Sequence, residues 1–173
     1  MANMITRFHN FDHIRTFIFR IVGLKVGAAS RTSGHFTLEY SLRKSTTGHV
    51  TIGENCFLGY QCRISAAKAL VHIGNRCNIG PNVSIETVRH RFNHQANKKW
   101  YNKPVSIHDN VWTGLGCTIL PGVTIGQNSI VAAGAVVAKD VPEGVLAGGV
   151  PPKPSGHCPN SPHVPLSPAE NVR

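Results

Sequence analysis

The sequence has few aromatic residues and no long hydrophobic run. Phe, Trp and Tyr make up only 7% of the 173 residues, which disfavours a core built from large side chains. No run approaches the ~18 apolar residues of a membrane span. The apolar stretch 17–24 contains Arg20 and is flanked by Arg15 and Lys25, which argues against a cleaved signal peptide. We therefore expect a single cytoplasmic domain.

Acidic residues are scarce. Eight Asp and Glu against 18 Lys and Arg give a formal net charge of +10, so anionic partners such as phosphates, acidic glycans or a membrane surface are favoured. Nucleic-acid binding is disfavoured, because no platform of stacking aromatic residues and no recognised motif accompanies the charge.

The cysteines lack the paired CxxC spacing of zinc sites. They are Cys56, Cys62, Cys77, Cys117 and Cys158. The first four fall on one position of a repeat, described next, where only small residues occur. We interpret these four thiols as small core hydrophobes and expect no metal site.

A six-residue repeat of aliphatic residues, the hexad beat, runs along much of the chain. Eleven of its twelve register positions are aliphatic, and only Thr113 departs. The positions are Ile52, Leu58, Ile64, Ile73, Ile79, Ile85, Ile107, Thr113, Ile119, Ile125, Val131 and Val137. This period matches neither the helical 3.6 nor the strand period of two, so each unit is predicted to be a short strand followed by a turn. Three units make one triangular coil, which predicts an all-β, parallel β-helix over residues 48–153.

The beat is lost between Ile85 and Ile107 and at both ends of the chain. Residues 91–104 are predicted to form a loop projecting from the prism, and such loops commonly carry function. Within the N-terminal segment 1–47, residues 5–24 have the apolar spacing of an amphipathic helix, which either packs on the first coil or rests on an anionic membrane surface. Seven of the 23 residues from Pro151 onward are Pro, so 154–173 is expected to be a disordered tail.

The closing hexads resemble those of the hexapeptide acetyltransferases. The resemblance rests on Asn110-Val-Trp-Thr-Gly114, Ile119-Leu-Pro-Gly-Val-Thr-Ile-Gly126, Ala133-Gly-Ala-Val-Val-Ala-Lys-Asp140 and Gly148-Gly-Val-Pro151. Within this superfamily the sequence is most similar to the maltose, galactoside and polysaccharide O-acetyltransferases. The resemblance implies a left-handed coil, a homotrimer with active sites between subunits, acetyl coenzyme A as acyl donor without a metal, and a sugar or glycan hydroxyl as acceptor.

The resemblance implies that His90 is the catalytic base. An alcohol must lose its proton as it attacks a thioester, and an imidazole that titrates near neutrality is a suitable acceptor. The second ring nitrogen needs an acceptor, and Glu86 is the nearest carboxylate in sequence. A backbone N–H in the turn near Gly114 is expected to stabilise the thioester oxygen as it becomes anionic.

Coenzyme A is expected along the closing coils. The resemblance places Trp112 beside the acyl and pantetheine end of the donor, Ala133, Ala138 and Lys139 along its groove, and Lys153 near its nucleotide. An alternative for Trp112 is an apolar residue sealed between subunits. Pro152 and Pro154 depart from the basic, aliphatic segment usual in the family, and the passage 62–71 is shorter than in the maltose enzymes, so no acceptor is identified by analogy.

The loop and its approaches gather a basic and aromatic set that suits an acidic or phosphate-bearing sugar. The acceptor-binding candidates are Arg89, His94, Lys98, Lys99, Trp100 and Tyr101. Alternatively, the charges are solvated and the aromatic residues pack against a neighbouring subunit.

Other functions on the same prism stay open. The acceptor nucleophile can be the nitrogen of an amino sugar or xenobiotic rather than a hydroxyl. A γ-type carbonic anhydrase would use His72, His90 and His94 as zinc ligands, but their spacing does not resemble that family. A non-catalytic assembly module is the remaining alternative.

Overall fold

The structure, a computed structural model, describes residues 24–34, 36–39, 50–66, 69–91, 99–150 and 152–157. The predicted helix over 5–24 therefore lies outside the described residues, apart from its last one, and so does most of the predicted tail. Within the described residues no helix is long and apolar enough to cross a membrane.

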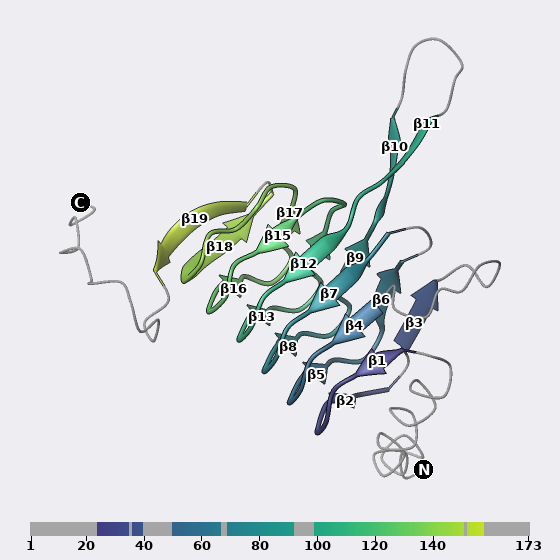
Figure 1. The fold of residues 1–173 in the computed structure, drawn as a ribbon. Helices are drawn as coiled ribbons and strands as arrows, with labels where there is room; N and C mark the ends of the chain where they lie inside the picture. The colour runs from purple at the N-terminus through teal and green to yellow at the C-terminus, as the bar shows by residue number, and fades with distance from the viewer. Residues whose placement is uncertain are drawn as a thin grey trace, which may run out of the picture.

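The described chain coils into a prism with three sheets as its faces (Figure 1). The first sheet contains β1 (Lys25–Val26), β4 (Val50–Ile52), β7 (Val71–Ile73), β12 (Val105–Ile107) and β15 (Thr124–Ile125). The second contains β2 (Arg31–Thr32), β5 (Phe57–Leu58), β8 (Asn78–Ile79), β13 (Trp112–Thr113), β16 (Ile130–Val131), β18 (Val145–Gly149) and β19 (Pro152–His157). The third contains β3 (Phe36–Glu39), β6 (Cys62–Ser65), β9 (Ser84–Glu86), β14 (Thr118–Ile119) and β17 (Val136–Val137).

The six-residue beat places one aliphatic side chain from each strand in the core. Ile79, Ile107, Ile119 and Ile125 are fully buried, and Ile64 is 1% exposed. Strands of successive coils pair in parallel and in register, so the buried residues of one coil stack on those of the next. This confirms the all-β fold of parallel strands that the beat predicts.

The small positions and corners also follow the repeat. The four cysteines of the repeat, Cys56, Cys62, Cys77 and Cys117, are buried and form no disulfide. At the corners Asn55, Asn82, Asn110 and Asn128 have φ between 55° and 59°. Asparagine and glycine tolerate this left-handed conformation better than other residues.

The coil extends beyond the range 48–153 that the hexads indicated. At the N-terminal side, β1, β2 and β3 pair in parallel with β4, β5 and β6, so a coil precedes the first recognisable hexad. At the C-terminal side, β19 pairs antiparallel with β18. Residues 154–157, predicted to begin a disordered tail, are therefore part of an edge strand, in which two proline residues are tolerated.

Candidate active site

A β-hairpin leaves the prism between the third and first sheets (Figure 1). Its strands are β10 (Val88–Arg91) and β11 (Lys99–Asn102), which pair antiparallel. The predicted loop 91–104 is thus more ordered than expected at its C-terminal end, and its paired stem begins at Val88. Backbone hydrogen bonds between the two strands supply the order that the sequence, which lacks the hexad beat here, does not show.

The ladder brings candidate residues from both sides of the loop together. His90 is directly opposite Trp100, Arg89 is opposite Tyr101, and Arg91 is opposite Lys99. For these residues only the backbone is described, and His94 and Lys98 lie outside the described residues. The register therefore brings four of the six acceptor candidates beside the predicted base, in backbone terms.

The foot of the hairpin is fixed to the prism. Lys103 N–H donates to the Thr87 carbonyl at 2.9 Å, and the buried Thr87 hydroxyl donates to the Ser65 carbonyl at 2.7 Å. A Cβ built on Gly122 would lie 2.7 Å from Cδ of Lys103, so the lysine stem runs close over that glycine. Through Thr87 and Ser65, these contacts tie the foot of the hairpin to the third sheet.

Asn102, the last residue of β11, is directly opposite Val88 at this foot. Its side-chain oxygen Oδ1 is buried and has no hydrogen-bond partner among the described residues. Leaving a buried acceptor unpaired costs about 1–3 kcal/mol. Nothing in the sequence marks Asn102, because it lies outside the hexads in the predicted loop.

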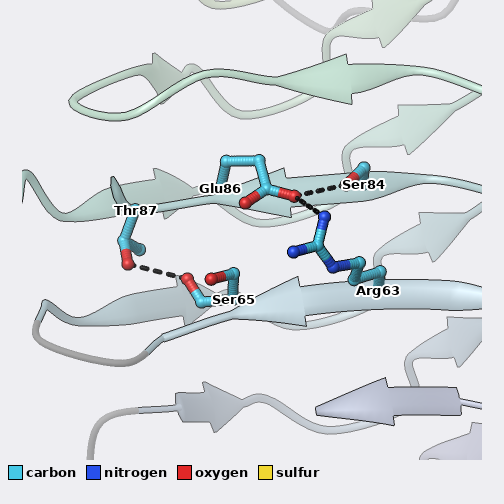
Figure 2. Close-up of polar contacts among 5 residues, drawn as sticks. All are labelled: Arg63, Ser65, Ser84, Glu86 and Thr87. Atoms are coloured by element: carbon cyan, nitrogen blue, oxygen red, sulfur yellow. Dashed lines mark hydrogen bonds and ion pairs between the residues drawn. The ribbon is translucent and has the colours of Figure 1, made fainter. Parts of the chain in front are cut away.

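Glu86, the predicted partner of His90, is engaged elsewhere (Figure 2). Its Oε1 accepts hydrogen bonds from Nη1 of Arg63 at 2.8 Å and from the hydroxyl of Ser84 at 2.7 Å. Arg63 lies on the preceding coil of the third sheet, opposite Ser84. An orienting role for Glu86 stays a prediction. The hydrogen bonds from Arg63 and Ser84 would compete with a hydrogen bond from His90 to this carboxylate.

Gly114 does not supply the free N–H that the sequence suggested near it. Its amide donates to the Val131 carbonyl at 2.8 Å, and the amide of Gly116 donates to the Pro81 carbonyl at 2.8 Å. Both groups are used to hold one coil on the next. The amide of Leu115, between them, has no acceptor within the described part of the chain, and the Leu115 side chain is 52% exposed.

The candidate cofactor residues divide between several edges of the closing coils. Trp112 is 53% exposed on the second sheet, and Gly114 stands against the backbone of Ala133 at the corner that follows. Ala138 and Lys139 are exposed at the next corner, after β17. Lys153 pairs with Gly148 on β19, and only its backbone is described. These candidates therefore come from the second sheet, from two successive corners and from the edge strand β19.

No group of three or more His, Cys, Asp or Glu able to hold a metal ion occurs within the described residues. His72, one of the three histidines of the zinc alternative, lies on the first sheet with its Nδ1 2.8 Å from the hydroxyl of Thr51. His90 lies on the hairpin. His72 and His90 thus lie on strands of different sheets, and His94 lies outside the described residues.

Two family models match the chain. The model described as bacterial transferase hexapeptide (six repeats) matches residues 104–139, and the one described as hexapeptide repeat of succinyl-transferase matches residues 49–86. The protein YvoF of Bacillus subtilis (strain 168) is 31% identical over 148 residues, which cover 85% of this chain and 69% of YvoF.

Solved structures give the same assignment. A maltose O-acetyltransferase from Clostridium difficile 630 is 32% identical and superposes with a TM-score of 0.64, covering 87% of this chain and 80% of that one. A hexapeptide-repeat acetyltransferase from Vibrio cholerae in complex with acetyl coenzyme A is 29% identical, with a TM-score of 0.72 over 85% of this chain and 78% of that one.

The chain spans about half the length of other curated relatives that it matches, among them the galactoside O-acetyltransferases of Lactococcus lactis and Escherichia coli. YvoF and the two solved structures nevertheless each match 85% or more of this chain. The chain belongs to the hexapeptide-repeat acetyltransferases.

Proposed function

We propose that the protein transfers an acetyl group from acetyl coenzyme A to a hydroxyl group of a sugar or glycan, with His90 as general base. The observation that carries this proposal is the position of His90 on a hairpin anchored to a hexapeptide prism. Relatives over 30% identical include a maltose and two galactoside O-acetyltransferases, and a solved relative is a complex with acetyl coenzyme A.

In the proposed reaction His90 takes the proton from the acceptor hydroxyl as its oxygen attacks the thioester carbonyl carbon. The new C–O bond forms, the C–S bond breaks, and the proton held by His90 passes to the departing thiolate of coenzyme A. A backbone N–H stabilises the carbonyl oxygen while it carries negative charge. The Leu115 amide suits this role better than that of Gly114, which already donates to Val131.

The closing coils are the proposed binding surface for the donor. Trp112 would contact the acyl and pantetheine end, since its exposed indole lies one coil from the small Ala133. The exposed Ala138 permits close approach of the pantetheine arm, and Lys139 offers a cation to its phosphates. Lys153 would approach the nucleotide, supported by the placement of β19 beside β18.

For the acceptor we propose an acidic or phosphate-bearing sugar, bound by the basic and aromatic residues of the hairpin. Those residues are Arg89, His94, Lys98, Lys99, Trp100 and Tyr101. Replacing Lys98 and Lys99 by Glu should then raise the acceptor KM and leave the acetyl coenzyme A KM unchanged. An unchanged acceptor KM at low ionic strength would exclude these two lysines from recognition.

We also propose a left-handed coil and a homotrimer. Trp112, Ile130 and Leu146 are successive partners on the outer face of the second sheet, and Trp112 is 53% exposed. On the same ladder, Asn78 separates Trp112 from Phe57, which is 44% exposed. An apolar stripe of this kind is typical of a surface that another protein covers, and closed symmetric assembly is the commonest way to cover it. Sedimentation equilibrium at micromolar concentration would give the trimer mass, and a monomer would contradict the proposal.

The test of the catalytic proposal is His90→Ala. Loss of a general base lowers transfer by about 10²- to 10⁴-fold, whereas affinity for acetyl coenzyme A should stay close to that of the wild type. Transfer is measured as thiol release from acetyl coenzyme A with a panel of maltose, methyl galactoside, galacturonate and glucosamine. Wild-type rates in the variant would refute the role of His90, and preference for glucosamine would favour the amino-sugar alternative.

A further inference from the structure

Asn102 brings a buried acceptor to the foot of the hairpin formed by β10 and β11. Its Oδ1 has no hydrogen-bond partner among the described residues. Buried polar groups are nearly always paired, so an exception needs a reason. The donor that would pair with this oxygen can come from a neighbour on the hairpin.

The ladder identifies which neighbour is nearest. His90 pairs with Trp100 and Val88 pairs with Asn102, so His90 and Asn102 are diagonal neighbours in the antiparallel pair. Residues two apart on one strand share a face of the ladder, and diagonal neighbours stand roughly 7–8 Å apart, within reach of long side chains. Histidine and asparagine side chains together can bridge such a distance.

A histidine that acts as a general base needs an acceptor for the N–H of its other ring nitrogen. Glu86 is the nearest carboxylate in sequence, but its Oε1 already accepts two hydrogen bonds, from Arg63 and Ser84 (Figure 2). Glu86 is thus already engaged by two donors, whereas Asn102 offers an acceptor that has no donor among the described residues.

We propose that Asn102 is the positioning residue of the proposed acetyl transfer, accepting a hydrogen bond from the imidazole of His90 through Oδ1. The inference rests on the proposed role of His90 as base. In this role Asn102 would not contact the substrates. It would fix the ring orientation and the tautomer that leaves the second nitrogen free to take the hydroxyl proton.

The first experiment compares Asn102→Leu with Asn102→Asp in the full-length protein. The leucine has a similar size and no acceptor, so kcat should fall by about 10- to 100-fold, the range expected when a catalytic group is misplaced by about 1 Å. KM for acetyl coenzyme A should not change. The aspartate keeps an acceptor and should recover most of the rate at high pH.

The second readout needs no acceptor substrate. A carboxylate beside the imidazole stabilises its protonated form, so Asn102→Asp should raise the pKa of His90 by about one unit or more. NMR of the ring C–H signal measures this pKa, and the loss of that signal in His90→Ala assigns it to His90. The acidic limb of the kcat/KM profile should move to higher pH by the same amount, because only the neutral ring accepts a proton. A carboxylate that does not contact the ring would act only at longer distance and would shift this pKa less.

Two controls separate the alternatives. Glu86→Gln should leave the His90 pKa unchanged, and a change there, with none in Asn102→Asp, would assign the orienting role to Glu86 instead. In the His90→Ala background, Asn102→Leu should cause no further loss of rate, because Asn102 acts only through the ring. A further loss there, or an unmoved His90 pKa in Asn102→Asp, would overturn the inference. Full activity of His90→Ala would instead refute the proposed base, whatever Asn102 does.

Discussion

Two glycines of one turn, Gly114 and Gly116, should respond in opposite ways to the same substitution. A Cβ built on Gly114 would lie 2.5 Å from the backbone nitrogen and 2.8 Å from Cα of Ala133 on the next coil. Gly116 has φ +69°, and nothing lies within 4 Å of its built Cβ. Close approach of two coils requires glycine at the first position, and the left-handed backbone requires it at the second.

These causes predict different substitution patterns. Gly114→Ala forces two coils apart and should destabilise the protein by about 1–3 kcal/mol, which lowers Tm by roughly 2–12 °C for a chain of this size. Gly114→Asn should be at least as harmful, because it adds the same Cβ and more atoms. Gly116→Ala should cost about 1–2 kcal/mol for a left-handed alanine.

Gly116→Asn, in contrast, should be nearly neutral. One coil earlier the equivalent corner residue is Asn82, which has φ 55°, and asparagine tolerates this conformation. Thermal unfolding followed by circular dichroism at one fixed protein concentration measures all four variants, since assembly makes Tm depend on concentration. Asparagine that is tolerated at Gly114, or that is as harmful as alanine at Gly116, would refute the reasoning.

Two further predictions concern buried thiols and one carboxylate. In a Cys158→Ser background, a thiol reagent should label the four cysteines of the repeat, Cys56, Cys62, Cys77 and Cys117, only after addition of urea. All four are buried, and burial raises the pKa of the Cys62 and Cys117 thiols. Rapid labelling of the native protein would contradict this. Asp109 accepts hydrogen bonds from the backbone N–H and then from the side-chain amide of Asn75, which lower its pKa below the ordinary 3.8. Ionised Asp109 therefore stabilises the fold above pH 3.8. This stabilisation is lost as the pH falls through the pKa of Asp109 in the folded state. Urea unfolding should therefore show that Asp109→Asn lowers stability at pH 7 and loses less on acidification than the wild type, and an equal acid loss in both proteins would exclude the contact as its source.

The hexad beat predicts the prism well because each aliphatic residue is selected by one physical requirement. Ile73, Ile107 and Ile125 stack in the core of successive coils, and a polar or large residue at any of them would disturb its neighbours above and below. Even the polar Thr113 fits this core, because its hydroxyl oxygen accepts a hydrogen bond from the Gly80 N–H at 3.3 Å. Local sequence therefore carries information about long-range packing.

The sequence analysis did not assign the coil over residues 25–39, because the repeat shows there at only three positions, Val26, Thr32 and Leu38, and one of them is polar. Its inward positions include Ser30 and Thr32, which are buried at 5% and 2% exposure in place of aliphatic residues. Ser30 is accommodated by donating its hydroxyl to the Gly53 carbonyl at 2.7 Å. Pairing with a well-formed neighbouring coil can thus support strands whose own pattern is too short and too polar to predict them.

The candidate site was predictable in part for a related reason. His90 lies just after the point where the six-residue repeat stops, which singles it out in the sequence. Trp112 lies at an outward position of the repeat, which the core does not constrain, and its side chain is exposed. The contacts of Glu86 were not predictable, because they cross from one coil to the next, to Arg63, which lies 23 positions away in sequence. Asn102 was missed because its partner strand is defined only once the hairpin has formed.

The hairpin is an insertion at the corner after β9 that leaves the repeat intact on both sides. The coil resumes at Val105, which pairs with Val71 as if no residues intervened, so the hairpin changes neither the register nor the core. Its foot is held by hydrogen bonds from Lys103 to Thr87 and from Thr87 to Ser65. A base carried at this foot can be positioned by the prism while the outer hairpin varies, which would let one scaffold serve different acceptors with little effect on stability.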